Sequence, residues 1–236
     1  MTTDGAEVDQ LRLARERVLE RIARAAERAG RDPTDVTLVA VSKTVPAERV
    51  RLAVAAGLDL LGENRVQDAE AKAAAVSGAT WHLVGPLQSN KARRALETFA
   101  VIETVGSVEL AVRLDELVRS AGRPGFPVLL QVNVDRDPSK AGFGPGDLEA
   151  AITSLDALAG LDFRGLMTVG RLVDDAESAR PTFATLRSLS ARVGARWPRL
   201  GPALSMGMTD DFEVAIEEGA TIVRIGRAIF GHRPTI

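Results

Sequence analysis

The 236-residue sequence contains no cysteine and no tyrosine. Without cysteine, the chain can form no disulfide, no thiolate nucleophile and no cysteine-based zinc site. Without tyrosine, it has no phenolic group to act as a general acid or base. Histidine is nearly absent too, and His82 and His232 lie too far apart in the sequence to show a metal-ligand spacing. We therefore expect no metal site, with His82 as a hydrogen-bonded wall residue and His232 in the C-terminal tail.

Lysine is scarce, since only four of the 30 basic residues are lysine and the others are arginine. Any mechanism that needs a neutral amine therefore has four candidates. Lys72 lies among alanines in a helical segment, where we expect a surface residue; Lys91 follows the turn GPLQSN at a helix start; Lys140 lies in the flexible-looking loop DPSKAGFG. Lys43 differs from these three because it ends an apolar run.

Charge and hydropathy limit the kinds of partner. The formal net charge of −2 lacks the clustered positive excess that phosphate backbones require, so we expect no nucleic-acid partner. Hydrophobic residues make up 45% of the chain and charged residues 26%, which is typical of a globular protein with a full core. The N-terminal residues MTTDGAEVDQ are acidic and polar, and no apolar run is long enough to span a membrane. We therefore expect a cytoplasmic protein with no membrane contact.

The segment 6–29 repeats small or apolar residues at the three-four spacing of one helical face. Its arginines alternate with acids, and the pairs Glu20–Arg24 and Glu27–Arg31 have the stabilising order. This interleaving favours a solvated helix face over an RNA-binding stripe.

The rest of the chain alternates short apolar runs with amphipathic stretches. Continuous apolar runs are typical of strands that are buried on both faces. The predicted strands are 36–42, 58–62, 80–85, 99–105, 127–134, 163–169, 203–207 and 221–226, and the predicted helices are 47–56, 64–77, 89–97, 107–120, 146–159, 174–194 and 209–218. We expect Trp81 in the core and Trp197 on a surface turn.

Eight strands that alternate with helices predict a parallel β/α barrel. We predict one α/β domain over residues 1–236, a (β/α)8 TIM barrel at about 36–230 preceded by an extra N-terminal helix at about 6–29. A doubly wound open sheet is the alternative, but no GxGxxG motif follows the first strand, and eight regular units favour closure. No linker rich in proline, glycine or serine divides the chain.

In such a barrel the reacting groups gather in the loops after the carboxyl ends of the strands. Lys43 stands at the first of these ends, where apolar walls and Arg224 would disfavour its charged form and favour a nucleophilic amine. An ordinary strand-end lysine that reaches solvent is the alternative. Arg224 interrupts the apolar eighth strand, and an arginine buried there needs a carboxylate or a ligand as its partner.

The loops after the seventh and eighth strands carry Gly207 and Gly226, with hydroxyls from Ser205 and Thr209 nearby. Barrels frequently build a phosphate site here from backbone N–H groups, although turn glycines beside a capping threonine at the helix start 209–211 are the plainer alternative. A lysine on the first strand, an arginine on the eighth and a phosphate cradle between the last two strands describe a pocket for pyridoxal 5′-phosphate (PLP). The lysine would form the Schiff base, and the arginine would face the pyridine nitrogen.

These residues lie in longer stretches that resemble one family over nearly the whole chain. The stretches are LVAVSKT (38–44), GENRVQD (62–68), WHLVGPLQSNK (81–91), NVDRDPSKAGF (133–143), RGLMTV (164–169), LSMGMTDDFEVAI (204–216) and VRIGRAIFG (223–231). In these stretches the sequence resembles the pyridoxal phosphate homeostasis proteins, which are related to the barrel domain of bacterial alanine racemases. The resemblance implies a barrel that carries PLP covalently on Lys43, with Arg224 at the ring nitrogen. It also implies that Asn64 lies near the cofactor and that the phosphate contacts come from Ser205, Gly207, Gly226 and the backbone of Arg227.

The sequence departs from the family pattern at three positions. Arg65 stands where tyrosine is common, Arg227 where a small hydroxyl residue is common, and Gly170 where proline is frequent. The backbone contact at Arg227 should survive, whereas a hydroxyl contact is lost. The added guanidinium could replace that contact with a charge-assisted bond or alter exchange of the cofactor.

An amino-acid racemase is one function that such a site could support. In the alanine racemase type, the second base is a tyrosine from a second domain, whereas this sequence has no tyrosine and ends at Ile236, just after the eighth strand. An arginine at the ring nitrogen would also keep the pyridine unprotonated and weaken it as an electron sink. Slow one-base activity from Lys43 alone stays open.

A PLP carrier is the function that we expect instead, a non-catalytic protein that takes part in vitamin B6 and amino-acid homeostasis. Its ligands would be PLP and related B6 vitamers, PLP-dependent apoenzymes are candidate recipients, and we expect a monomer. A third alternative is a sugar-phosphate enzyme with Lys43 as an aldolase-type amine. It predicts paired carboxylates near Lys43, for which Glu63 is the nearby strand-end candidate.

Overall fold

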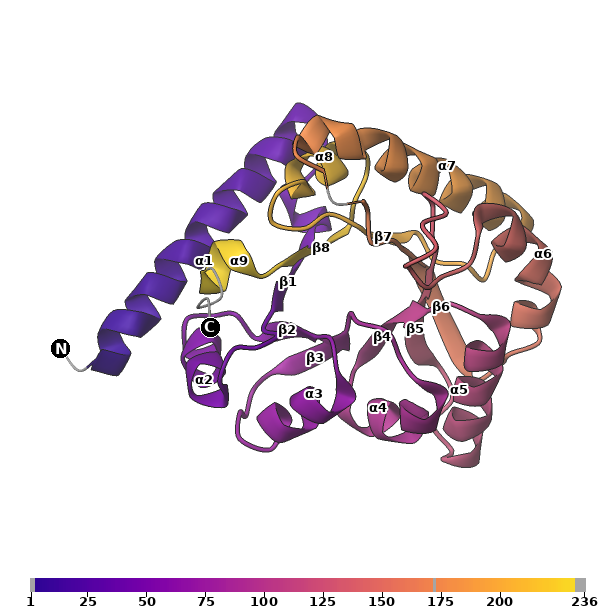
Figure 1. Ribbon diagram of the computed structural model, residues 1–236, viewed down its shortest axis with the longest axis horizontal. Helices are drawn as coiled ribbons and strands as arrows, with labels where there is room; N and C mark the ends of the chain where they lie inside the picture. Colours follow the sequence, from indigo (N-terminus) through magenta and orange to yellow (C-terminus); the bar gives the residue numbers. More distant parts are fainter. Residues whose placement is uncertain (1–2, 172, 232–236) are drawn as a thin grey trace.

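The computed structural model describes residues 3–171 and 173–231 as a closed barrel of parallel strands with helices around it (Figure 1). Each strand pairs with the next along the chain, and β8 pairs with β1 to complete the ring. The strands are β1 (Thr37–Val41), β2 (Leu60–Glu63), β3 (Thr80–Leu83), β4 (Val101–Val105), β5 (Phe126–Gln131), β6 (Leu161–Met167), β7 (Ala203–Ser205) and β8 (Ile222–Ile225). The α-helices are α1 (Thr3–Arg28), α2 (Ala47–Ala55), α3 (Val66–Ala73), α4 (Ala92–Thr98), α5 (Val108–Ser120), α6 (Pro145–Asp156), α7 (Arg180–Arg196), α8 (Phe212–Glu217) and α9 (Arg227–Phe230), and short 3₁₀ turns are η1 (Pro33–Asp35), η2 (Ser89–Lys91) and η3 (Ala176–Ala179).

The barrel closes because its strands bury side chains on both faces. On β1, Ala40 belongs to the apolar layer beneath the helices, whereas Val39 is fully buried on the opposite face, inside the barrel. Gly62 of β2 leaves room there, since a Cβ at that position would lie 2.9 Å from a methyl group of Val39. The predicted α/β barrel with an N-terminal helix is therefore confirmed, and the open-sheet alternative is wrong. The fifth strand is shorter than predicted and ends at Gln131 rather than at residue 134.

Helix α1 packs along the outside of the barrel against α2, α8 and α9 (Figure 1). Its apolar face is buried, as the three-four spacing predicts, and Arg12, Arg17 and Arg24 are exposed, as on a solvated face. Two other arginines reach the barrel: the Arg21 Nε lies 2.6 Å from a carboxylate oxygen of Glu213 on α8, and Arg31 donates to two backbone carbonyls at the end of that helix and just beyond it. Arg21 and Arg31 therefore fasten this segment to the barrel. Helix α1 has 26 residues but is polar, and within 3–171 and 173–231 no helix is both long enough and apolar enough to cross a membrane.

The predicted position is right for one of the two tryptophans and wrong for the other. Trp81 is buried in the core, as predicted. Trp197 is buried as well, so its predicted place on a surface turn is wrong: its ring centroid lies 4.9 Å from that of Phe163, and its indole Nε1 donates to Asp156 over 2.7 Å. The turn that follows α7 folds inward because this large ring covers the start of β6.

Lys72 is also placed differently from the prediction. Its side chain runs beneath the end of β1, where the ammonium is paired with the fully buried carboxylate of Glu63 and donates to the Ser42 carbonyl over 2.7 Å. The Ser42 hydroxyl donates to the same carboxylate over 2.7 Å. Sequence context failed here because a lysine among alanines carries no sign of the partner that lies nine residues earlier. This buried pair joins α3 to the ends of β1 and β2, directly before Lys43.

Replacing Lys72 with methionine should lower the free energy of unfolding by about 3–5 kcal/mol, because the change leaves the Glu63 carboxylate buried without its counter-charge. Denaturant unfolding followed by circular dichroism measures this effect. Lys91→Met serves as the control and should change stability by less than about 0.5 kcal/mol. A similar small loss in both variants would contradict the assigned role, whereas the neutral double variant Glu63→Gln/Lys72→Met should recover part of the loss.

Candidate functional site

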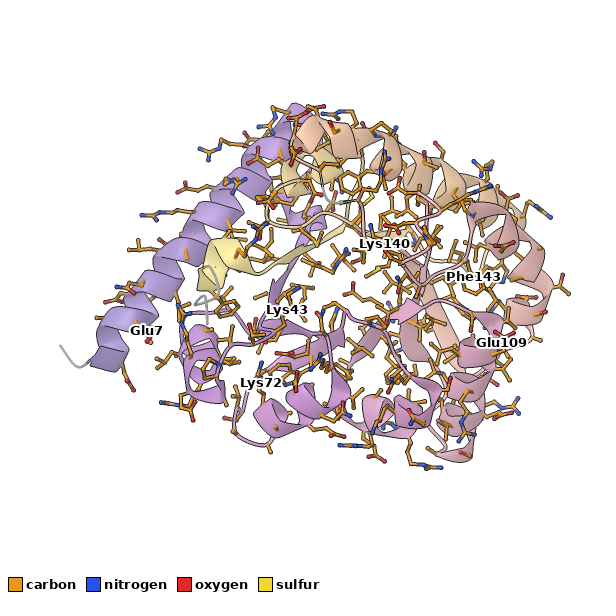
Figure 2. All side chains as sticks on the ribbon, viewed as in Figure 1. Glu7, Lys43, Lys72, Glu109, Lys140 and Phe143 are labelled. Atoms are coloured by element: carbon orange, nitrogen blue, oxygen red, sulfur yellow. The ribbon has the colours of Figure 1, made fainter. Side chains whose placement is uncertain are left out.

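Lys43 lies in a turn two residues beyond β1, with its side chain exposed. Ser42 fixes the start of this turn, since its amide donates to the Gly62 carbonyl over 3.0 Å and its own carbonyl accepts from the Val45 amide over 3.0 Å. Thr44 adopts a left-handed backbone with φ of 66°, which is uncommon for a residue with a branched side chain. The turn thus presents the Lys43 amine at the carboxyl ends of the strands, beside β1 and β2 (Figure 2).

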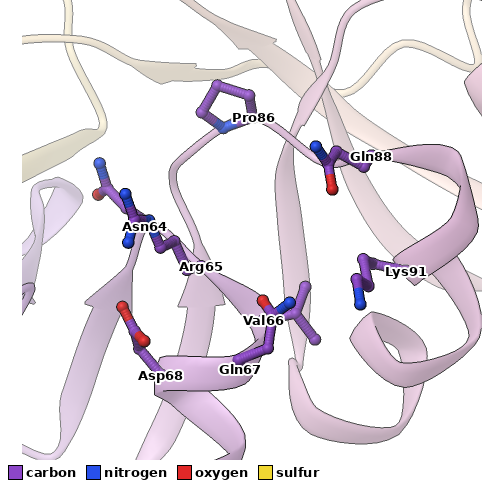
Figure 3. Close-up of a pocket in the computed structure, with 8 residues that line it drawn as sticks. All are labelled: Asn64, Arg65, Val66, Gln67, Asp68, Pro86, Gln88 and Lys91. Atoms are coloured by element: carbon purple, nitrogen blue, oxygen red, sulfur yellow. The ribbon is translucent and has the colours of Figure 1, made fainter.

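Asn64 follows β2, and it borders a pocket of about 630 Å³ between the loops after β2 and β3 (Figure 3). The walls include the cations Arg65 and Lys91 and the amide of Gln88. Gly85 permits the close approach of the two loops, because a Cβ there would lie 2.4 Å from the Asn64 carbonyl oxygen. Arg65, the residue in the usual tyrosine position, therefore lines this side pocket.

A second hollow of about 410 Å³ lies in the loop between β5 and α6. Lys140 lines it, but the lysine is anchored rather than loose: its ammonium donates to the Gly170 carbonyl over 2.9 Å and to the Val169 carbonyl over 3.3 Å. Asn133 braces the same loop by donating to the carbonyl of Asp137 over 2.8 Å. Lys140 thus fastens the loop after β5 to the loop after β6 across the barrel opening from Lys43 (Figure 2).

Gly207 and Gly226 open the loops after β7 and β8. Gly207 has φ of 91°, and a Cβ there would lie 2.6 Å from the side chain of Ala215, so glycine is required. A Cβ at Gly226 would lie 3.2 Å from the Val41 carbonyl oxygen, so the loop after β8 runs close to the end of β1. The first N–H groups of α9 follow Gly226 and have no carbonyl partner within the helix.

Arg227 and Asp210 connect the loops after β8 and β7 by an ion pair between two half-exposed side chains. The Arg227 guanidinium is thus paired with the Asp210 carboxylate of the same chain. The predicted helix start at 209–211 is a turn instead, since α8 begins at Phe212. Asp211 braces this turn by accepting from the Met208 amide over 2.6 Å, and burial raises the pKa of its carboxyl while that hydrogen bond lowers it.

Arg224 points into the barrel and is 4% exposed. It pairs in register with Val39 of β1, and its guanidinium donates to the Ser205 hydroxyl over 2.6 Å and to the Thr168 carbonyl over 2.7 Å. Burial lowers the pKa of this guanidinium, and the negative charges of Glu103 and Asp211 oppose that shift. The sequence predicted that a buried Arg224 needs a partner. Groups of the protein itself, the Ser205 hydroxyl and the Thr168 carbonyl, take this role.

Glu103 is a site residue that the sequence prediction missed. It is fully buried on β4, accepts from the Ser205 hydroxyl over 2.5 Å and lies 2.6 Å from Nδ1 of His82. His82 is therefore a hydrogen-bonded wall residue, as predicted. A signal for Glu103 was available, because it interrupts an apolar strand in the same way as Arg224 does.

The predicted site residues share the carboxyl-terminal end of the barrel, but they lie at two depths. Lys43, Asn64, Gly207 and Gly226 belong to the loops and Arg227 begins α9, whereas Ser205 and Arg224 lie on strands and are buried. Within residues 3–171 and 173–231, no group of three histidine, aspartate or glutamate side chains could hold a metal ion. His232 lies outside the described residues.

Known proteins match this chain over most of its length. The family model for the alanine racemase N-terminal domain matches residues 14–234. The pyridoxal phosphate homeostasis protein of Pseudomonas aeruginosa is 46% identical over 220 residues, covering 92% of this chain and 93% of that protein, and the protein of that name from Escherichia coli K12 is 39% identical over 224 residues, covering 92% and 94%. The structure of PipY from Synechococcus elongatus with PLP bound superposes with a TM-score of 0.79 at 42% identity, covering 91% of this chain and all of PipY. The chain therefore belongs to the family of pyridoxal phosphate homeostasis proteins, built on the barrel of the alanine racemase N-terminal domain.

Proposed function

We propose that this chain binds PLP as a Schiff base on Lys43 and stores or delivers it without efficient turnover. The observation that carries the proposal is an exposed lysine at the end of β1 beside a β8 strand with a buried arginine, in a chain whose relative PipY has been solved with PLP bound. Bound PLP would supply an aldehyde carbon, and the Lys43 Nζ would be the amine that holds it, with loss of one water molecule.

Two features of the site fit the rest of the cofactor. Arg224 donates through Nη1 to the Ser205 hydroxyl and through Nη2 to the Thr168 carbonyl, and its guanidinium has five N–H groups in all, so others can serve an acceptor such as a ring nitrogen. For the phosphate we assign the backbone around Gly207, Gly226 and Arg227, where glycines allow close approach and a helix begins. Asn64 is assigned to the wall beside Lys43, since Ser42 pairs with the strand that Asn64 follows.

Arg227 stands where the family commonly has a small hydroxyl residue, and this difference affects the assigned phosphate site less than the added charge suggests. Its backbone N–H keeps the place assigned to it, and its guanidinium is paired with Asp210. The hydroxyl contact of the usual residue is lost without a charge-assisted replacement from this side chain. A half-exposed pair of this kind contributes at most about 1 kcal/mol to stability.

The carrier function is favoured over racemisation by a missing group. A two-base racemase needs a second proton donor opposite the lysine, and no tyrosine exists in the sequence to supply a phenol. An arginine at the ring nitrogen, rather than an acid, further weakens carbanion stabilisation.

The aldolase-type alternative needs a free carboxylate next to Lys43. Glu63 is the nearest predicted candidate, but its carboxylate is fully buried and shared between Lys72 and Ser42. A carboxylate held in this way serves the turn rather than a sugar substrate. Several further properties stay predictions. They are the binding of related B6 vitamers, delivery to PLP-dependent apoenzymes, a monomeric state, a cytoplasmic location and a role in amino-acid homeostasis.

Replacing Lys43 with alanine should abolish the visible absorption band of the PLP-loaded protein and the covalent label left by borohydride reduction. In the unchanged protein, reduction followed by peptide mapping should place that label on Lys43. Lys91→Ala is the matched control, and it should keep both the band and the label. A label on Lys72, Lys91 or Lys140 in the unchanged protein would overturn the assignment.

Incubation of the PLP-loaded protein with pure L-alanine or pure D-alanine should leave the optical activity unchanged over hours, because the second base is missing. Chiral chromatography of the amino acid measures the outcome. Turnover at enzyme-like rates, on the order of 1 per second or faster, would restore the racemase function.

A further inference from the structure

A continuous chain of hydrogen bonds crosses the inside of the barrel. It begins at His82 on β3, passes through Glu103 on β4 and Ser205 on β7, and ends at Arg224 on β8. Its three contacts are 2.6, 2.5 and 2.6 Å long, and all four residues are buried. In the ring of strands, β4 stands opposite β8, so the chain connects the two sides of the barrel.

The direction of each hydrogen bond at Ser205 follows from its neighbours. Arg224 can only donate, and the Glu103 carboxylate accepts from the Ser205 hydroxyl, which has a single proton. Ser205 must therefore accept from the guanidinium and donate its proton to the carboxylate. No second proton remains on this hydroxyl for a phosphate oxygen, which is itself an acceptor.

Glu103 carries the negative charge at the other end of this bridge. A guanidinium that is 4% exposed has lost most of its hydration, so it requires a nearby counter-charge and fixed acceptors. Glu103 supplies the charge through Ser205, and the Thr168 carbonyl supplies a second acceptor at 2.7 Å. Together these contacts leave the guanidinium in one orientation.

We propose that Glu103 is the positioning residue for Arg224, with Ser205 as the bridge between them rather than as a ligand of the cofactor phosphate. This inference rests on the proposed function, because it concerns the contact between Arg224 and the ring nitrogen of PLP on Lys43. It also replaces the phosphate contact that the family resemblance implied for Ser205.

Pyridoxal, which lacks the phosphate, separates the two possible roles of Ser205. If Ser205 holds Arg224, Ser205→Ala weakens the binding of PLP and of pyridoxal by the same factor. If Ser205 binds the phosphate, the substitution weakens PLP alone. Binding of each compound to the full-length chain, freed of cofactor, can be titrated by the absorbance of the Schiff base.

The Glu103→Gln variant tests the role of the carboxylate charge. Glu97 on α4 is exposed, and Glu97→Gln serves as the matched control. Glu103→Gln should weaken PLP and pyridoxal alike by about tenfold or more, which is the typical size of a lost hydrogen bond to a charged group. It should also shift the pH midpoint of the bound chromophore, because the ring nitrogen loses its ordered donor. Glu97→Gln should change neither quantity.

A double variant shows whether Glu103 acts through Arg224. Glu103→Gln/Arg224→Met is neutral and close in volume to the original pair, so it avoids an isolated buried charge. Its chromophore should have the same pH midpoint as that of Glu103→Gln alone. General loosening of the barrel would weaken binding without moving this midpoint.

The inference is overturned if Glu103→Gln keeps the unchanged protein's midpoint, or if Ser205→Ala weakens PLP but not pyridoxal. If the Glu103→Gln variant fails to fold, the Ser205→Ala variant alone tests the inference, because it keeps the side chains of both Glu103 and Arg224. Failure of the proposed function looks different: borohydride would then label no residue, or a residue other than Lys43, in the unchanged protein.

Discussion

The charge of Arg224 is the constraint around which the inside of this barrel is organised. A guanidinium that faces the interior of a closed sheet cannot reach solvent, so the surrounding strands must supply acceptors and a counter-charge. They do so with Ser205 on β7, Glu103 on β4 and the carbonyl that follows β6. This arrangement explains why polar residues occur in the middle of strands that are otherwise apolar. It also fixes the deeper half of the proposed cofactor site before any ligand arrives.

The upper half of the site depends on a second buried pair. Lys72 and Glu63 hold the end of β1 through Ser42, and Lys43 follows that residue directly. Two buried carboxylates thus accompany two cations, one beneath the turn that carries Lys43 and one inside the barrel.

The sequence predicted the barrel well because its signals are local. Eight apolar strand runs alternate with seven amphipathic stretches, and Lys43, Arg224 and the loop glycines all stand at strand ends or within strands. The failures concern contacts between residues that are distant in the sequence or that change environment through packing. Lys72 was expected at the surface because its carboxylate partner lies on another element, and Trp197 was misplaced because only the folded turn brings it onto Phe163. Glu103 was missed for the same reason, because its contacts with His82 on β3 and Ser205 on β7 depend on the closure of the barrel.

In the proposed function, one site holds the cofactor between Lys43 above and an oriented Arg224 below. A crystal structure of the PLP-loaded protein tests this arrangement most directly. We predict continuous electron density from the Lys43 side chain to the cofactor, the Arg224 guanidinium at the ring nitrogen, and the Ser205 hydroxyl still between Glu103 and Arg224. Cofactor bound away from Lys43, or a Ser205 hydroxyl rotated onto the phosphate with Arg224 displaced, would contradict the account.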